Sequence, residues 1–128
     1  MSLEYREKEV RVPERLHFLA KTSGVSVPAG GTVYLPDSSG IDVSRYKYKT
    51  ITVKCDATLF ARIEVRDDEG EDWDIYYPTP PSTWETVYSG RIATYSFEDD
   101  YKYARLAVYN SGATNQTVTK FVFKGRRL

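Results

Sequence analysis

The residues best suited to recognise a ligand lie in Asp72–Gly90, the stretch DWDIYYPTPPSTWETVYSG. Tyrosine and tryptophan rings combine apolar area with a hydrogen-bonding edge, which suits sugar faces and protein partners alike. Three prolines fix φ and withhold backbone donors, so residues 77–83 should run extended and be stiff before any ligand binds. The sequence therefore predicts a ligand-binding set of Tyr76, Tyr77, Trp84, Tyr88 and Arg91.

The same stretch also contains core candidates. In DWDIYY, alternation places Trp73, Ile75 and Tyr77 on one face of a strand. Asp74 and Tyr76 would lie on the other face, and we expect Trp73 in the core. The exposure of Trp84, which follows the prolines, stays open. A second aromatic face carries Tyr103 and Tyr109, and it is either a rival binding site or the surface through which identical subunits pack.

The chain contains few of the residues that catalysis requires. With one histidine, His17, and one cysteine, Cys55, neither a cysteine-rich metal site nor a Cys/His cluster can form. Cys55 alternates with apolar residues, which indicates a small core residue, and His17 lies on a predicted strand without a nucleophile nearby. We expect no enzyme, although a pair of carboxylates for glycoside hydrolysis remains a third alternative.

Calcium is the cofactor that the acidic turn DDEGED allows, because hard oxygen ligands on a loop are what this ion takes. Its ligands would be Asp67, Asp68 and Asp72. The spacing does not match the known twelve-residue calcium loop, and a solvated hairpin tip explains the acids equally simply. The prediction is no cofactor, with calcium as the exception to test.

Charge and hydropathy exclude several partner classes. The 128 residues carry 18 basic and 18 acidic side chains, and no basic run exceeds Arg126-Arg127, so a nucleic-acid partner is not expected. No apolar run approaches the length of a membrane span, and the charged start of the chain has no signal-peptide core. We expect a soluble protein without membrane insertion, extracellular or virion-associated rather than a cytoplasmic enzyme.

The elements that position these residues are predicted to be strands. Turn signals recur at short intervals, and between them Val, Ile, Thr, Tyr and Phe alternate with polar residues, which is typical of half-buried antiparallel strands. Helix signals are nearly absent, the best being a single turn at 42–48. The predicted strands are 16–20, 32–35, 49–55, 59–66, 85–88, 92–97, 103–110 and 117–124.

About eight short strands favour an all-β fold, a two-sheet antiparallel sandwich of jelly-roll type. We find no internal repeat and no linker, so residues 1–128 are interpreted as one domain. Residues 1–10 are interpreted as an N-terminal segment outside the folded part.

Two segments, 40–77 and 101–125, carry a resemblance to a known family. The first joins an alternating strand to a second strand, an acidic Gly turn and Trp73; the second has an aromatic strand with YARL, a loop and a last strand ending at Gly125. Both resemble discoidin-like and other galactose-binding-like sandwiches, and the set of small jelly-roll modules attached to carbohydrate-active enzymes and found in phage tail and virion proteins.

The resemblance implies recognition rather than catalysis. The leading interpretation is a non-catalytic module that binds a carbohydrate or cell-surface ligand through loop aromatics. The alternative is a structural subunit of a phage tail, virion or other protein assembly, with a protein partner or a second copy on the Tyr103 and Tyr109 face.

Overall fold

The computed structural model describes residues 17–127, which form strands without any helix. The predicted segment 1–10 and Leu16 of the first predicted strand lie outside these residues. The strands are β1 (His17–Thr22), β2 (Val25–Val27), β3 (Thr32–Leu35), β4 (Ile41–Asp42), β5 (Tyr48–Cys55), β6 (Leu59–Arg66), β7 (Asp74–Tyr77), β8 (Glu85–Val87), β9 (Ala93–Glu98), β10 (Tyr103–Tyr109) and β11 (Gln116–Arg126).

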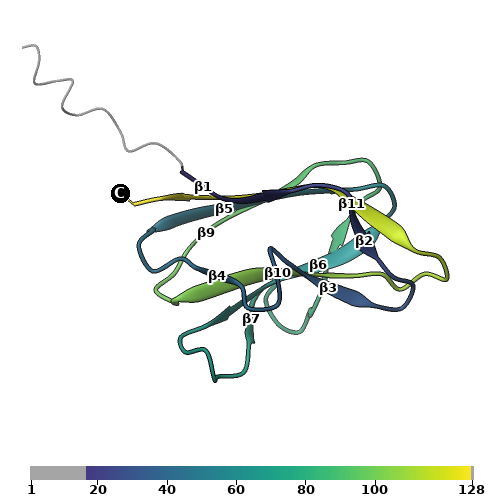
Figure 1. Ribbon diagram of the computed structural model, residues 1–128. Helices are drawn as coiled ribbons and strands as arrows, with labels where there is room; N and C mark the ends of the chain where they lie inside the picture. The colour runs from purple at the N-terminus through teal and green to yellow at the C-terminus, as the bar shows by residue number, and fades with distance from the viewer. Residues whose placement is uncertain (1–16, 128) are drawn as a thin grey trace, which may run out of the picture.

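The strands form two antiparallel sheets that stack as layers (Figure 1). The five-stranded sheet has the order β1-β11-β5-β9, with β2 also paired to β11. The six-stranded sheet has the order β3-β10-β6-β7, with β4 paired to β10 and β8 to β6. The predicted all-β, two-sheet antiparallel sandwich is confirmed, while its jelly-roll type stays a prediction. No helix of residues 17–127 is long and apolar enough to cross a membrane.

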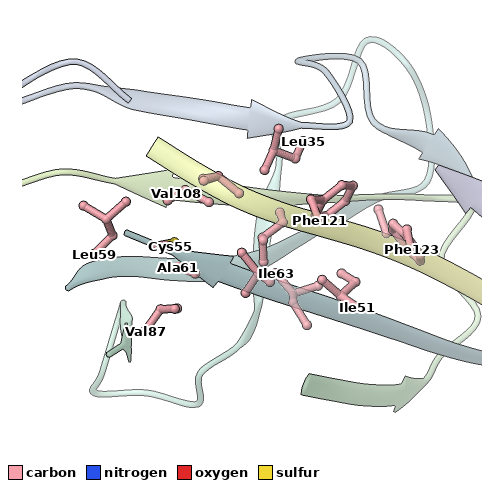
Figure 2. Packing of buried hydrophobic residues seen from close by; sticks show 14 of the residues in the cluster. Leu35, Ile51, Cys55, Leu59, Ala61, Ile63, Val87, Val108, Phe121 and Phe123 are labelled. Atoms are coloured by element: carbon pink, nitrogen blue, oxygen red, sulfur yellow. The ribbon is translucent and has the colours of Figure 1, made fainter. Parts of the chain in front are cut away.

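The core fills the space between the two layers (Figure 2). Phe121 and Phe123 of β11 and Ile51 of β5 point inward from one sheet and meet Ile63 of β6 from the other. Strict alternation along β5 and β6 produces this arrangement, because every second side chain faces the same side of a sheet. Cys55 is fully buried there, and this burial raises the pKa of its thiol to about 11.

Two strands escaped the sequence interpretation because they are too short to show a pattern. β2 and β4 have only three and two residues. β7, which the alternation in DWDIYY predicts, spans Asp74–Tyr77 and leaves most of its side chains exposed. After Asp42 the chain makes a single hydrogen-bonded turn, in which the Tyr46 amide donates to the Val43 carbonyl. The Asp42 carboxylate accepts hydrogen bonds from the Ser44 backbone and hydroxyl. These bonds lower the pKa of Asp42.

The outer face of the six-stranded sheet is covered by stacked arginine and aromatic side chains. Glu64 of β6 accepts hydrogen bonds from Arg62 and Arg105, both at 2.7 Å, and is buried between them. The Arg105 guanidinium lies 3.9 Å from the centre of the Tyr34 ring and 4.1 Å from that of Trp73. These contacts connect the loop that contains Trp73 to the outer face of the sheet.

The expectation of Trp73 in the core is wrong. Trp73 is half-buried, and its ring stacks against Arg66 at 4.3 Å and Arg105 at 4.1 Å on the outer face. A β-carbon at Gly40 would lie only 2.6 Å from the ring, and Gly40 has a φ of 72°. The Trp73 ring therefore packs between guanidinium groups on the outer face, and not against apolar side chains in the core as the alternation pattern predicts.

Candidate functional site

A cleft of about 980 Å³ runs along β9 at the open side of the sandwich. β9 is the edge strand of the five-stranded sheet and β7 is an edge strand of the six-stranded sheet, and side chains from both line the cleft. The volume lies at the upper end of the range of small-molecule sites. The lining residues are Tyr48, Lys49, Thr50, Ile63, Tyr76, Tyr77, Thr79, Thr94, Tyr95, Ser96, Phe97, Glu98 and Arg126.

Aromatic pairs join the two sheets across this cleft. The rings of Tyr76 and Phe97 have centroids 5.4 Å apart, and those of Tyr77 and Tyr95 are 5.6 Å apart. The Tyr76 hydroxyl also donates a hydrogen bond of 2.9 Å to the Glu98 carbonyl of β9. Two edge strands that share no backbone pairing are thus connected through side chains.

A β-bulge explains why Tyr76 and Tyr77 both line the cleft although they are adjacent in the sequence. In the pairing of β6 with β7, Ile63 is opposite Tyr77 while Glu64 is opposite Ile75, which leaves Tyr76 as the extra residue. A bulge changes the direction of a side chain that strict alternation would send to the other face. The expectation that Tyr76 and Tyr77 face opposite sides is therefore wrong, and both ligand-binding predictions fall in one site.

Two donors at the cleft have no hydrogen-bond partner within residues 17–127. The buried hydroxyl of Tyr95 and the buried Nε of Arg126 are both in this state. Desolvation, with smaller effects of Glu85 and Tyr77, raises the pKa of Tyr95 to about 12, so its hydroxyl keeps its proton at neutral pH. Buried polar groups are normally paired, so these two donors, which their surroundings close from solvent, are exceptions in the wall of the cleft.

The Tyr76 hydroxyl is also protonated at neutral pH. Desolvation is the main cause of its raised pKa, followed by the negative charges of Asp99 and Glu98. Because this hydroxyl already donates to the Glu98 carbonyl, its role in the cleft is to hold the ring of Tyr76 in place.

Lys49, which lines the cleft, is held by a buried ion pair with Asp99. Lys49 is almost completely buried, and its Nζ donates to the Asp99 carbonyl at 2.8 Å and lies 3.5 Å from the Asp99 carboxylate. The lysine also lies over the Phe97 ring, 5.9 Å from its centroid. Lys49 is thus engaged within the chain, which leaves Arg126 as the cation available to a ligand in the cleft.

Trp84 belongs to a different surface from the cleft. It is half-buried on the outer face of the six-stranded sheet, where it lies 4.2 Å from the Arg62 guanidinium and 5.4 Å from the Tyr109 ring. Tyr103 and Tyr109 are half-buried on the same face, as the alternation predicts. The prolines before Trp84 do not run extended throughout, because Pro80 and Pro81 lie in a turn.

Tyr88 and Arg91 occupy an exposed turn between β8 and β9. The Arg91 amide donates to the Tyr88 carbonyl, and Ser89 is held by hydrogen bonds to the turn that contains Asp56 and Thr58. Tyr88 is 62% exposed. The predicted set Tyr76, Tyr77, Trp84, Tyr88 and Arg91 is therefore divided among three places, and only Tyr76 and Tyr77 line the cleft.

The acidic hairpin between β6 and β7 is closed by its own contacts. The Glu71 carboxylate accepts hydrogen bonds from the backbone amides of Asp67 and Asp68, and Arg66 donates to the carbonyls of Glu69 and Glu71. Within residues 17–127 no group of three or more acidic, histidine or cysteine side chains is arranged to hold a metal ion. Calcium binding by Asp67, Asp68 and Asp72 stays a prediction.

Several lining residues were missed by the sequence interpretation. Alternation in ATYSFE placed Tyr95 and Phe97 on one face of a predicted strand, which was the available signal. The sequence did not show that β7 and β9 would lie side by side, because the two strands belong to different sheets. Tyr48 of β5 and Arg126 of β11 are register partners on the outer face of the five-stranded sheet, a proximity that depends on the pairing of these two strands.

The protein is thus, by its fold, a two-layer antiparallel β-sandwich with an aromatic cleft between two edge strands. A comparison of the sequence with protein families found no match, and no curated protein matches it either.

Proposed function

We propose that this protein is a non-catalytic recognition module that binds a carbohydrate, free or on a cell surface, in the cleft between β7 and β9. The observation that carries the proposal is an exposed aromatic side chain, Tyr77, in a cleft that is also lined by threonine and serine hydroxyls. Tyr77 is 36% exposed beside Tyr95, whose hydroxyl lacks a partner within residues 17–127. Sugars present apolar ring faces and many oxygens, and they match such a lining.

The lining also supports recognition rather than hydrolysis. Glycoside hydrolysis generally uses two carboxyl groups on either side of the scissile bond. Among the described residues of the cleft, Glu98 supplies the single carboxylate. The hydroxyls of Thr50, Thr79 and Ser96 and the guanidinium of Arg126 are suited to hydrogen-bonding a sugar without attacking it.

The test is glycan binding, first on an array and then by titration with the ligand that the array identifies. Tyr77→Ala is expected to weaken binding about tenfold or more, since a stacked ring near the centre of a site is typically a hot spot. Tyr88→Ala is the matched control, because it removes an exposed tyrosine that does not line the cleft and should leave affinity unchanged.

Two results would contradict the proposal. If the protein binds no glycan on the array, carbohydrate recognition is wrong. If Tyr88→Ala or Trp84→Ala abolishes binding while Tyr77→Ala does not, the ligand binds through one of the other two aromatic surfaces. Urea unfolding of each variant separates a loss of contact from a loss of structure.

A structural subunit of a larger assembly, such as a phage tail or virion, is the second candidate. Large apolar side chains outside the cleft support it: Tyr88 and Ile92 are 62% and 57% exposed in one turn, and Phe18 is 63% exposed on β1. Patches of this kind often mark protein contacts. Sedimentation of the full chain tests it, since a defined oligomer that Tyr88→Ala or Tyr109→Ala dissociates would favour assembly over glycan binding.

A further inference from the structure

The outer face of the five-stranded sheet carries hydroxyl and cationic side chains on neighbouring strands. On β5, Thr50 and Thr52 alternate with the buried Ile51 and Val53 and therefore point outward. Thr50 lies 3.3 Å from the Ser96 hydroxyl, and Thr52 lies 3.5 Å from that of Thr94. The face thus has rows of neighbouring hydroxyls that run across the sheet.

Two lysines on this face are placed directly against each other. Lys54 of β5 is the register partner of Lys120 of β11. The pairs on either side of them, Cys55 with Val118 and Val53 with Phe121, face the core. Like charges that are directly opposite in a sheet destabilise it. Neither lysine forms an ion pair within residues 17–127. Local stability alone gives no reason for this arrangement.

Further outward-facing cations lie along β11 and on the neighbouring β1. Lys124 and Arg126 point outward from the same strand, and Lys21 is outward on β1 opposite Val122. Glu98, at the end of β9, is the single acid among the outward-facing residues of this sheet's described strands. The chain as a whole has no net charge, so its acids gather elsewhere, notably between 67 and 74 on the other sheet.

The cationic face is continuous with the cleft. Thr50, Ser96 and Arg126 point outward on this sheet and also line the cleft. The Arg126 guanidinium lies over the Tyr48 ring, 4.8 Å from its centroid, and its buried Nε has no partner in the described part of the chain. A ligand bound at Tyr77 would therefore meet unneutralised positive charge where it leaves the cleft.

We propose that the outer face of the five-stranded sheet extends the cleft into a binding surface for an acidic polysaccharide, one that carries carboxylate or sulfate groups. Lys54, Lys120, Lys124 and Arg126 bind the anionic groups, and the threonine and serine rows bind sugar hydroxyls. This inference rests on the proposed carbohydrate function and specifies the class of its ligand. The repulsion between Lys54 and Lys120 is then relieved when an anion lies between them.

Other anionic partners fit this face less well. A nucleic acid would bind through its phosphates, but the hydroxyl rows would then lack a role. The acidic hairpin of a second copy would bring opposite charge, but Glu71 is already engaged within the hairpin. Both partners are outcomes of the experiment below.

The experiment compares four probes by titration with the full chain at low and high salt: heparin, polygalacturonate, neutral dextran and duplex DNA. At least one acidic polysaccharide should bind much more tightly than dextran, with an affinity that falls as salt rises. The double change Lys54→Gln with Lys120→Gln should weaken that binding about tenfold or more. Its Tm should be unchanged or higher, because the opposed charges are gone.

Lys102→Gln is the matched control, since Lys102 is an exposed lysine near the other sheet and should leave binding unchanged. If dextran or another neutral glycan binds equally well through Tyr77, this inference is wrong while the proposed function stands. If no glycan binds, both are wrong. DNA binding equal to that of the acidic polysaccharides, with the same lysine dependence, overturns the inference. So does self-association that Asp67→Asn with Asp68→Asn abolishes.

Discussion

Glu64 holds the arginine network of the six-stranded sheet together, and its loss should cost a large part of the stability. Its carboxylate accepts from Arg105 and Arg62 at 2.7 Å each, and the side chains of Glu64 and Arg105 are 4% and 10% exposed. Removing one partner of a buried pair costs about 3–5 kcal/mol. Glu64→Gln keeps the shape and one acceptor, so we expect about 3 kcal/mol, near the lower limit.

Urea unfolding followed by tryptophan fluorescence measures this loss, and the Tm should fall by about 12 °C at about 4 °C per kcal/mol for a domain of this size. Asp100→Asn is the control, because Asp100 is an exposed acid and its change should stay within about 0.5 kcal/mol. A loss below about 1 kcal/mol for Glu64→Gln would refute the reasoning. It would mean that the stacked rings around Arg105 alone stabilise its charge.

Three further predictions concern single positions. Gly40→Ala should destabilise the protein by about 2 kcal/mol and Gly90→Ala by about 1 kcal/mol. Both glycines have positive φ, but of the two only Gly40 would bring a new β-carbon into a clash, and urea midpoints measure the difference. The pKa of Tyr95, raised to about 12, implies stability that is complete below pH 10 and lost as pH rises toward 12; Tyr95→Phe should lessen this fall in the urea midpoint. Cys55, buried with a thiol pKa of about 11, should react with a thiol reagent at neutral pH only after unfolding, and rapid labelling of the native protein would contradict its placement.

The fold class could be predicted because it depends on local patterns. The alternation in 49–55 and 59–66 identifies β5 and β6 and the faces that they bury. The pairing of strands far apart in the sequence could not be predicted, since β11 lies between β1 and β5 through contacts that no local pattern encodes. β2 and β4 were missed because strands of three and two residues show no alternation.

The candidate site was predicted in part, and the misplaced residues share physical causes. Tyr76 and Tyr77 lie together because a bulge interrupts alternation, and a bulge is visible only in the pairing of two strands. Trp73 is held outside the core by stacking on Arg66 and Arg105, partners that an alternation pattern does not consider. Tyr88 remained a candidate by residue type alone, and the turn that contains it lies apart from the cleft.

The arginine network has a further consequence for how the chain selects one pairing of its strands. Arg105 contacts Glu64 and Trp73 and also donates to the Ser38 carbonyl, so four separate parts of the chain meet at one side chain. A slip of β10 by one residue would turn Arg105 into the apolar interior and Leu106 out to the surface. The charge of Arg105 thus makes misregistered sheets costly, and the network that covers this face also specifies the register of the strands beneath it.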